Sequence, residues 1–287
     1  MDLLWRHAGG AIDCARGRLI GIVNATPDSF TDQGAHFGVE SSVARGVAQA
    51  EAGADIVEVG GESLRYKPAI TPEVEIARVA PVIERLVAEL DVPVAIDTFK
   101  PAVAEAAIAA GAVILNDPTG LREPGMREVA AAGRVGVVLS HYFGPPKIRP
   151  TSFPDVDVPE TVVAWARREI DEAAHAGIDP ARIVVDPGVG LGKSPEQDLD
   201  LLHRLDEVVA GVGRPVFVPI SNKKVIGAVT GAAPKDRLGG TAAGLVWSRL
   251  RGARIFRVHD VAIMRQALSM TEALADGAPT EWHWVAK

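Results

Sequence analysis

The chain has 287 residues, 47% of them hydrophobic, with a net charge of −7 and an isoelectric point near 5.5. This negative balance argues against a nucleic-acid partner, and no apolar stretch is long enough to span a bilayer. The single cysteine, Cys14, excludes an internal disulfide, and the N-terminus lacks the apolar core of a signal peptide, so we expect a cytoplasmic protein.

Eight short apolar runs rich in Val and Ile follow one another along the chain, and each has the length of a buried parallel strand. They span residues 19–23, 54–59, 92–96, 112–115, 135–140, 183–185, 215–220 and 253–258. Helical signals fill most of the gaps, as in residues 40–53, 72–90, 101–111, 159–177 and 238–252, and several of these segments close on a glycine.

This alternation predicts right-handed βαβ units, and eight of them predict an α/β fold, a closed (β/α)8 TIM barrel forming one domain over residues 1–287. The competing fold is an open doubly wound sheet. It usually opens with a glycine-rich turn, whereas the first strand here runs into Asn24-Ala25-Thr26-Pro27-Asp28. Ahead of that strand, residues 5–18 contain Gly9-Gly10 and predict a short N-terminal hairpin that plugs the barrel floor.

Each predicted strand stops at a polar residue. In chain order these residues are Asn24, Glu62, Asp97, Asn116, His141, Asp186, Ser221 with Lys223, and Arg257 with His259. Active sites of such barrels lie at the C-terminal ends of the strands, so we expect these side chains to converge on one pocket.

Arg257 and His259 indicate a phosphate site at the eighth strand. They are two residues apart, so they point the same way, and they directly precede a helix beginning near Asp260. Arg65, after the second strand, can supply another guanidinium group. The alternative is an Arg and a His that only form salt bridges with neighbouring helices.

Asp97, Asn116 and Asp186 end strands three, four and six, and Lys223 follows strand seven. Carboxylates at the mouth of an apolar barrel are costly unless they are paired, so a ligand with adjacent N–H donors would suit them. Capping of the following helix or turn is the alternative for one Asp alone. The cluster as a whole favours a flat, amino-substituted heterocycle.

Two other kinds of site are discounted. The run Gly188-Val189-Gly190-Leu191-Gly192-Lys193-Ser194 is similar to a P-loop, but Pro187 stands where the first glycine is required and Pro195 follows at once. No His and Cys residues have the spacing of a zinc site.

The chain resembles the dihydropteroate synthases along nearly its whole length. The matching motifs, in order, are Ile22-Val23-Asn24-Ala25-Thr26-Pro27-Asp28-Ser29-Phe30, Gly60-Gly61-Glu62-Ser63, Ile96-Asp97-Thr98, Asn116-Asp117, Asp186-Pro187-Gly188 with Gly192-Lys193, and Arg257-Val258-His259-Asp260. The resemblance implies an eight-stranded barrel that joins a pterin diphosphate to p-aminobenzoate in folate biosynthesis and releases pyrophosphate.

The resemblance also implies residue roles. Asp97, Asn116, Asp186 and Lys223 would hold the pterin ring, and Asn24, Arg65, Arg257 and His259 the diphosphate, with the cofactor Mg2+ at Asn24. Asp97, Arg65 and Lys223 would be the catalytic residues. The reaction would be dissociative, with cationic groups and Mg2+ stabilising the leaving pyrophosphate. A homodimer formed through the last helices is a further family expectation.

Departures from the family pattern cluster at the second-substrate pocket. Where the family usually reads Thr-Arg-Pro-Gly, this chain has Leu64-Arg65-Tyr66-Lys67, and the family's Ser-Arg-Lys is Ser221-Asn222-Lys223. The Met-His pair after strand five is Ser140-His141. Replacing Arg by Asn222 removes a fixed cation and a bidentate donor. Lys67 or Lys224 would restore the charge, but in another place and without the planar fork of a guanidinium.

Three hypotheses follow from these motifs. The first is a synthase with an adjusted p-aminobenzoate pocket. The second is a dihydropteroate synthase-like paralogue, such as the second paralogues of actinobacteria, that binds pterin or pterin diphosphate and uses another nucleophile or lacks the condensation. The third is a pterin-binding module without catalysis, which the retention of Arg65, Arg257 and His259 disfavours.

Overall fold

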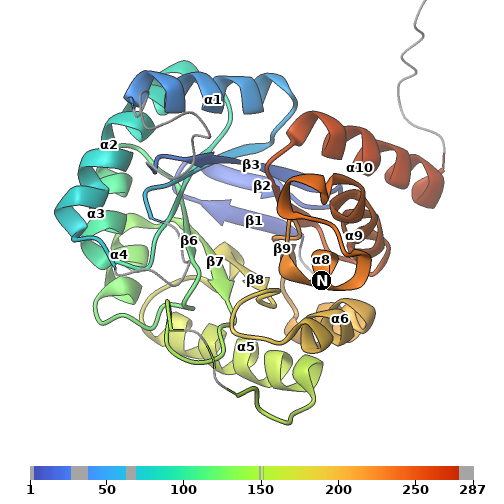
Figure 1. The fold of residues 1–287 in the computed structure, drawn as a ribbon. Coiled ribbons are helices and arrows are strands. Elements are labelled where there is room, and N and C mark those ends of the chain that lie inside the picture. Colours follow the sequence, from blue (N-terminus) through green and yellow to red (C-terminus); the bar gives the residue numbers. More distant parts are fainter. Residues whose placement is uncertain (1–2, 27–37, 63–68, 149, 151, 278–287) are drawn as a thin grey trace, which may run out of the picture.

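The computed structural model describes residues 3–26, 38–62, 69–148, 150 and 152–277, and its ribbon is drawn in Figure 1. Within these ranges eight parallel strands pair in the order β8-β7-β6-β5-β4-β3-β10-β9. They are β3 (Arg18–Asn24), β4 (Ile56–Gly60), β5 (Val94–Asp97), β6 (Ile114–Asp117), β7 (Gly136–Ser140), β8 (Ile183–Asp186), β9 (Phe217–Val218) and β10 (Ile255–Val258). An isolated parallel bridge between Val185 and Val216 joins the two end strands, so the sheet closes into the predicted barrel.

Helices surround the barrel in the order that the chain alternation requires (Figure 1). They are α1 (Val39–Glu51), α2 (Pro72–Glu89), α3 (Pro101–Ala109), α4 (Met126–Gly133), α5 (Val158–His175), α6 (Pro195–His203), α7 (Leu205–Val212), α8 (Lys224–Thr230), α9 (Leu238–Leu250) and α10 (Val261–Asp276), with the 3-10 turns η2 (Pro180–Arg182) and η3 (Pro234–Asp236). None of these helices in the described part of the chain is long and apolar enough to cross a membrane.

β9 is shorter than the run 215–220 from which it was predicted. Pro215 and Pro219 bracket it, and proline has no N–H group to donate to a strand ladder. The chain between these prolines therefore pairs over only two residues with β10, where Ile255 lies beside Phe217.

The lower interior of the barrel is apolar and is closed by the N-terminal hairpin. Each strand contributes one buried side chain to this layer: Ile20, Ile56, Ala95, Ile114, Val138, Val184, Phe217 and Ile255. The hairpin consists of β1 (Leu4–His7) and β2 (Gly10–Asp13), which pair antiparallel. Its Trp5 is fully buried against this layer, and the indole Nε1 donates to the carbonyl of Arg182 at 2.8 Å, just before β8 begins. The predicted plug of the barrel floor is confirmed.

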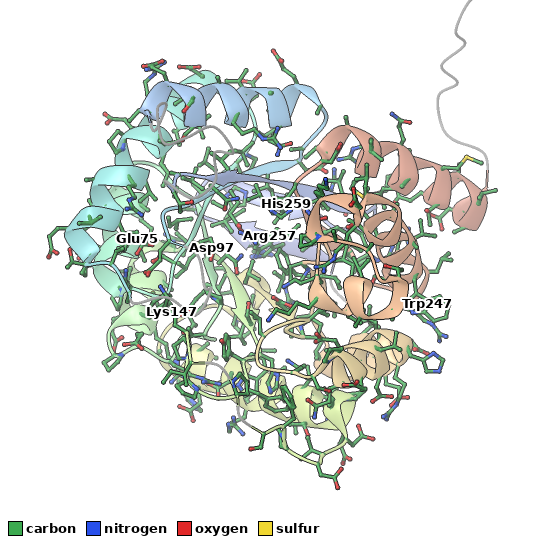
Figure 2. All side chains as sticks on the ribbon, in the orientation of Figure 1. Glu75, Asp97, Lys147, Trp247, Arg257 and His259 are labelled. Atoms are coloured by element: carbon green, nitrogen blue, oxygen red, sulfur yellow. The ribbon has the colours of Figure 1, made fainter. Side chains whose placement is uncertain are left out.

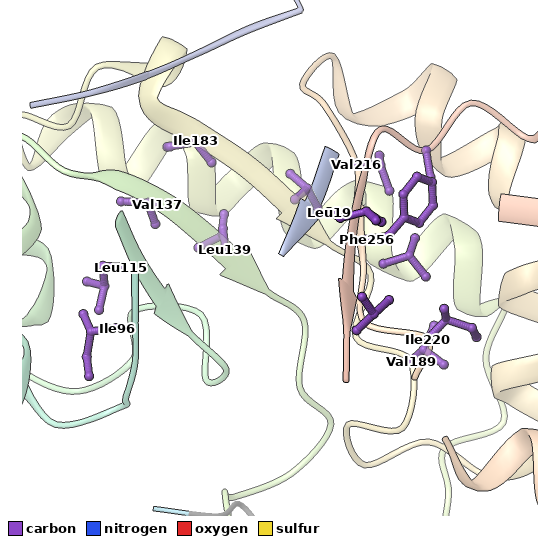
Figure 3. Packing of buried hydrophobic residues seen from close by; sticks show 14 of the residues in the cluster. Leu19, Ile96, Leu115, Val137, Leu139, Ile183, Val189, Val216, Ile220 and Phe256 are labelled. Carbon is purple, nitrogen blue, oxygen red and sulfur yellow. The ribbon is translucent and has the colours of Figure 1, made fainter. Parts of the chain in front are cut away.

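A second apolar layer lies between the barrel and its helices. Alternate strand residues face outward into it, as Leu19, Ile96, Leu115 and Phe256 do in Figure 3. The helices cover this layer with their own buried faces, for example through Leu86 of α2. Both faces of the sheet are therefore buried, which explains why the strands read as continuous apolar runs.

Candidate active site at the C-terminal ends of the barrel strands

Above the apolar lower layer, toward the C-terminal ends of the strands, the barrel interior becomes polar. Side chains alternate between the two faces of a strand, so the residue two positions after each lower-layer residue also points inward. On six strands that residue is polar: Glu58, Asp97, Asn116, Ser140, Asp186 and Arg257. The polar layer lies at the C-terminal ends of the strands, where such barrels carry their active sites.

Glu58 lies at the centre of this polar layer. Its carboxylate is fully buried and accepts hydrogen bonds from Asn116 Nδ2, at 2.8 Å, and from Nε of Arg257. The Arg257 guanidinium also donates through Nη2 to Asp97 at 2.6 Å. Figure 2 shows Asp97, Arg257 and His259 close together within the barrel. Glu58 thus joins the predicted residues Asp97, Asn116 and Arg257 in one hydrogen-bonded network across β4, β5, β6 and β10.

Asp186 and Lys223 form the other half of the mouth. The Asp186 carboxylate accepts from the backbone N–H of Gly188 at 2.7 Å and from the Ser140 hydroxyl at 3.2 Å. The Lys223 side chain lies over Gly190, where an added Cβ would come within 3.1 Å of its Cδ. Burial lowers the pKa of Lys223 and raises that of Asp186, and the attraction between the two opposes both shifts. A carboxylate and an ammonium group are therefore neighbours here, as the sequence predicted.

The electrostatics of Asp97 and His259 differ from those of free side chains. Burial raises the pKa of Asp97 to about 7, Arg257 opposes this shift, and Glu58 adds to it. Burial lowers the pKa of His259 to about 4, and the charges of Arg257, Arg45 and Lys223 act in the same direction. At neutral pH His259 is therefore an uncharged imidazole.

Two predicted strand-end residues do not join this site. Glu62 lies two residues beyond β4 and instead pairs with Lys100 at 2.6 Å and with Lys147. His141 packs edge-on against Phe143 and Trp165, because it follows the inward-facing Ser140 and so points outward. The expectation that all strand-end residues converge on one pocket is wrong for these two.

The P-loop-like run is a structural loop. Lys193 Nζ donates to the carbonyl of Gly188 at 2.9 Å and to that of His141 at 3.3 Å. Ser194 begins α6 with a capping box completed by Gln197. The lysine that would bind a nucleotide phosphate is thus used to hold two barrel loops together.

Asn222 adopts a left-handed conformation with φ of 57°. Asparagine adopts this left-handed region more readily than most other non-glycine residues. Its backbone N–H donates to Thr241 Oγ1 at 3.1 Å, and its carbonyl accepts from Arg237 at 3.0 Å. The position that departs from the family pattern is therefore also one where the backbone favours the residue found here.

Several predicted residues are not placed. Leu64, Arg65, Tyr66 and Lys67 lie outside the described residues. Asn24 is described and lies exposed at the end of β3.

Glu58 is not among the residues that the sequence predicts for the site, because the run 54–59 has the apolar pattern of a buried strand. An acidic residue inside an otherwise apolar run was the available signal, since a buried carboxylate needs partners. Its position two residues after Ile56 would have placed it on the inward face.

The described residues fit a magnesium ion only in combination with a phosphate ligand. Within those ranges, no group of three or more His, Cys, Asp or Glu side chains is placed to hold a metal. Asn24 offers one neutral oxygen at the exposed end of β3. Mg2+ usually keeps several waters and binds through one or two side chains plus substrate phosphates, which suits this arrangement.

The fold and the site together place the chain among the TIM-barrel proteins that carry a polar site of carboxylate, amide, ammonium and guanidinium groups at the C-terminal ends of the strands. Residues 20–259 match the family described as "Pterin binding enzyme". The chain is 36% identical over 266 residues to the dihydropteroate synthase of Escherichia coli, covering 92% of this chain and 94% of that one. It therefore belongs to the dihydropteroate synthase family.

A bifunctional relative and a solved structure extend this comparison. A probable bifunctional folylpolyglutamate synthase/dihydropteroate synthase of Haloferax volcanii is 42% identical over 260 residues, which cover 90% of this chain but 30% of the relative. The chain thus spans about a third of the length of that archaeal protein. Xanthomonas albilineans dihydropteroate synthase in complex with 7,8-dihydropteroate is 42% identical, with a TM-score of 0.86 over 96% of this chain and all of that one.

Proposed function

We propose that the protein condenses 6-hydroxymethyl-7,8-dihydropterin diphosphate with p-aminobenzoate and releases pyrophosphate. The observation that carries the proposal is the gathering of Asp97, Asn116 and Asp186 in the polar layer, with Lys223 beside them, above an apolar floor. This set offers acceptors for an amino group and ring N–H, and a donor for a ring carbonyl, as a pterin requires. The related Xanthomonas albilineans structure, which holds 7,8-dihydropteroate, supports the same reaction.

In the proposed mechanism the protein positions both reactants and supplies no nucleophile. The carboxylates and amide of the polar layer accept the pterin N–H groups, and Lys223 donates to the ring carbonyl. The bond between the pterin methylene and oxygen breaks, and its electron pair leaves with pyrophosphate. The p-aminobenzoate nitrogen then forms the new C–N bond and releases a proton to solvent.

The diphosphate would lie against Arg257 and His259 at the end of β10. Arg257 keeps donor capacity beyond its contacts with Glu58 and Asp97, because a guanidinium carries five N–H groups. Arg65 is proposed to provide a further cation. A Mg2+ bound at Asn24 would neutralise charge that develops on the leaving group.

The decisive experiment supplies pure protein with the pterin diphosphate, Mg2+ and p-aminobenzoate, and measures pyrophosphate and dihydropteroate together. We expect equal amounts of both products, abolished by Asp186→Asn and by Arg257→Ala. Asp276→Asn, on the exposed end of α10, is the matched control and should retain activity. No turnover despite tight pterin binding would refute the synthase and favour the paralogue or the binding module.

The variant Asn222→Arg separates the first two hypotheses further. In a working synthase with an adjusted pocket, restoring the family's arginine should leave turnover almost unchanged. In a paralogue that uses another nucleophile, Asn222→Arg combined with Leu64→Thr should create p-aminobenzoate condensation that the parent protein lacks.

We also propose that the protein is a cytoplasmic homodimer. The support for dimerisation is an apolar surface on α6, α8 and α9 where Leu199, Val229 and Trp247 are exposed around a cavity of about 420 Å3. Apolar surface of this kind commonly marks a protein interface. Val229→Glu should give a monomer by light scattering. Val74→Glu, a similarly apolar and exposed position on α2, should leave the mass unchanged.

A further inference from the structure

Ser221 and His259 make two hydrogen bonds to each other at the C-terminal ends of two neighbouring barrel strands. Ser221 Oγ lies 2.8 Å from Nδ1 of the His259 ring, and the backbone N–H of His259 donates to the same Oγ at 3.3 Å. The residues come from neighbouring strands, since Ser221 follows β9 and His259 follows β10. The sequence pattern had assigned Ser221 to the pocket for the second substrate, but the geometry directs its hydroxyl to the imidazole.

We propose that Ser221 is a positioning residue that holds His259 as the Nε2–H tautomer, so that the ring donates a hydrogen bond to the anionic leaving group. This inference rests on the proposed function, because it assigns the tautomer needed at the diphosphate end of that site. It moves Ser221 from the pocket of the second substrate to that of the first.

The hydrogen-bond inventory of the serine carries the argument. A hydroxyl has one proton to donate and two lone pairs. One lone pair of Ser221 Oγ already accepts from the His259 backbone. Donation of the hydroxyl proton to Nδ1 satisfies both groups, and it makes Nδ1 the acceptor of the ring. In a neutral imidazole the proton then resides on Nε2, at the opposite edge.

The surrounding charges keep the ring neutral. Burial and the cations Arg257, Arg45 and Lys223 all disfavour an imidazolium ion at this position. A neutral ring donates from only one nitrogen, so the choice of tautomer decides whether the ring can donate to an anion. A positively charged imidazole would donate from both nitrogens, so Ser221 would not be needed to determine which nitrogen carries the proton.

The main chain of His259 is held as firmly as its ring. Its carbonyl accepts from Arg45 Nη2 at 2.7 Å and from Gln49 Nε2 at 3.0 Å, both on α1. Gln49 also donates to the carbonyl of Ile22 at 3.2 Å, which ties this clamp to β3. The ring therefore has a fixed point of attachment, and the serine only has to set its rotation and proton position.

The first test is spectroscopic and requires no turnover. Protein labelled with 15N at histidine is examined by long-range proton–nitrogen correlation, and the His259 signals are assigned by their loss in His259→Asn. We expect a pyridine-type Nδ1 and a pyrrole-type Nε2 in the parent. In Ser221→Ala the two nitrogen shifts should move toward each other as both tautomers become populated, and the ring should titrate at higher pH. Ser221→Thr, which keeps the hydroxyl, should restore the parent spectrum.

The second test compares binding of the two substrates. Loss of one positioned hydrogen bond should weaken pterin diphosphate binding by about fivefold in Ser221→Ala, with recovery in Ser221→Thr. The KM for p-aminobenzoate should stay unchanged. A role in the second-substrate pocket would give the reverse pattern, with the spectrum unaltered.

The outcomes separate this inference from the proposed function. A parent spectrum showing Nδ1–H, or a Ser221→Ala spectrum identical to the parent's, overturns the role of Ser221 whatever the activity. The expected spectra in a protein that shows no condensation would leave the tautomer assignment standing and overturn only the proposed function.

Discussion

Glu58 gives the polar layer its geometry, because one buried carboxylate receives both the amide of Asn116 and the guanidinium of Arg257. In Glu58→Gln a single amide oxygen would face two donors, and its own NH2 group would face one of them. We expect the dissociation constant for the pterin diphosphate to rise by about tenfold or more, the usual effect of losing a charge-assisted hydrogen bond. Isothermal titration calorimetry measures it, with Glu89→Gln on α2 as the control. An unchanged dissociation constant would contradict the positioning role of Glu58.

Asp97 should make the stability of the protein depend on pH. Burial raises its pKa from an ordinary value near 3.8 to about 7, so between these values the folded state binds more protons than the unfolded state. The contribution of Asp97 to stability is therefore fully present below about pH 4 and is lost as pH rises through 7. Relative to the parent, Asp97→Asn should gain in Tm as pH increases from 5 to 8, measured by calorimetry. A Tm difference that stays constant over this range would show that the carboxyl has an ordinary pKa.

At the scale of single residues the sequence pointed to several members of the polar cluster that the structure shows, and the reasons for its failures are physical. Asp97, Asn116, Asp186 and Arg257 were identifiable because the active sites of such barrels are built from polar residues at the C-terminal ends of the strands. Glu62 and His141 looked the same in the sequence, but whether a residue points in or out depends on where the strand ladder begins. That register is set by pairing with neighbouring strands, which the local pattern does not contain.

Among the structural elements, the hairpin β1–β2 closes the floor with very few residues. Trp5 is fully buried there, and its neighbour Leu4, on the other face of the strand, is 41% exposed. Trp5→Ala should lower the free energy of unfolding by about 3–5 kcal/mol, since it leaves a large cavity and frees the carbonyl of Arg182. Leu4→Ala should change it by less than about 1 kcal/mol. Denaturant unfolding of both variants measures the difference, and equal effects would mean that the plug contributes little.

Element boundaries were predictable where local chemistry ends an element. Pro72 and Pro101 begin α2 and α3 at the predicted positions, because proline is well suited to the first turn of a helix. β9 was overestimated, because its apolar residues continue past the prolines that limit its hydrogen bonding. An apolar run thus predicted burial correctly, but it did not by itself predict how many residues pair.

At the scale of the whole barrel, the pairing between neighbouring strands is weakest between β8 and β9. β8 and β9 are joined by an isolated bridge at Val185, whose N–H donates to the carbonyl of Pro215 at 3.0 Å. Val57 makes the equivalent bond to Pro93 at 3.1 Å, but it lies within a continuous ladder between β4 and β5. Native-state hydrogen exchange should therefore show faster exchange at Val185 than at Val57, because local opening begins where fewest bonds must break. Equal protection of the two amides would mean that the barrel opens as one unit.

The closed floor also determines at which end of the barrel the protein can be attached to a surface without covering its polar layer. The hairpin contacts the starts of several strands, as in the bonds of Trp5 to Arg182 and of Arg214 to Leu4, and Leu3 packs against the apolar lower layer, on the side away from the polar layer. A tag or tether attached there would anchor the protein by its base and leave the opening facing the solution. Immobilised in this orientation on a sensor surface, the barrel should accept its small-molecule ligands as freely as it does in solution.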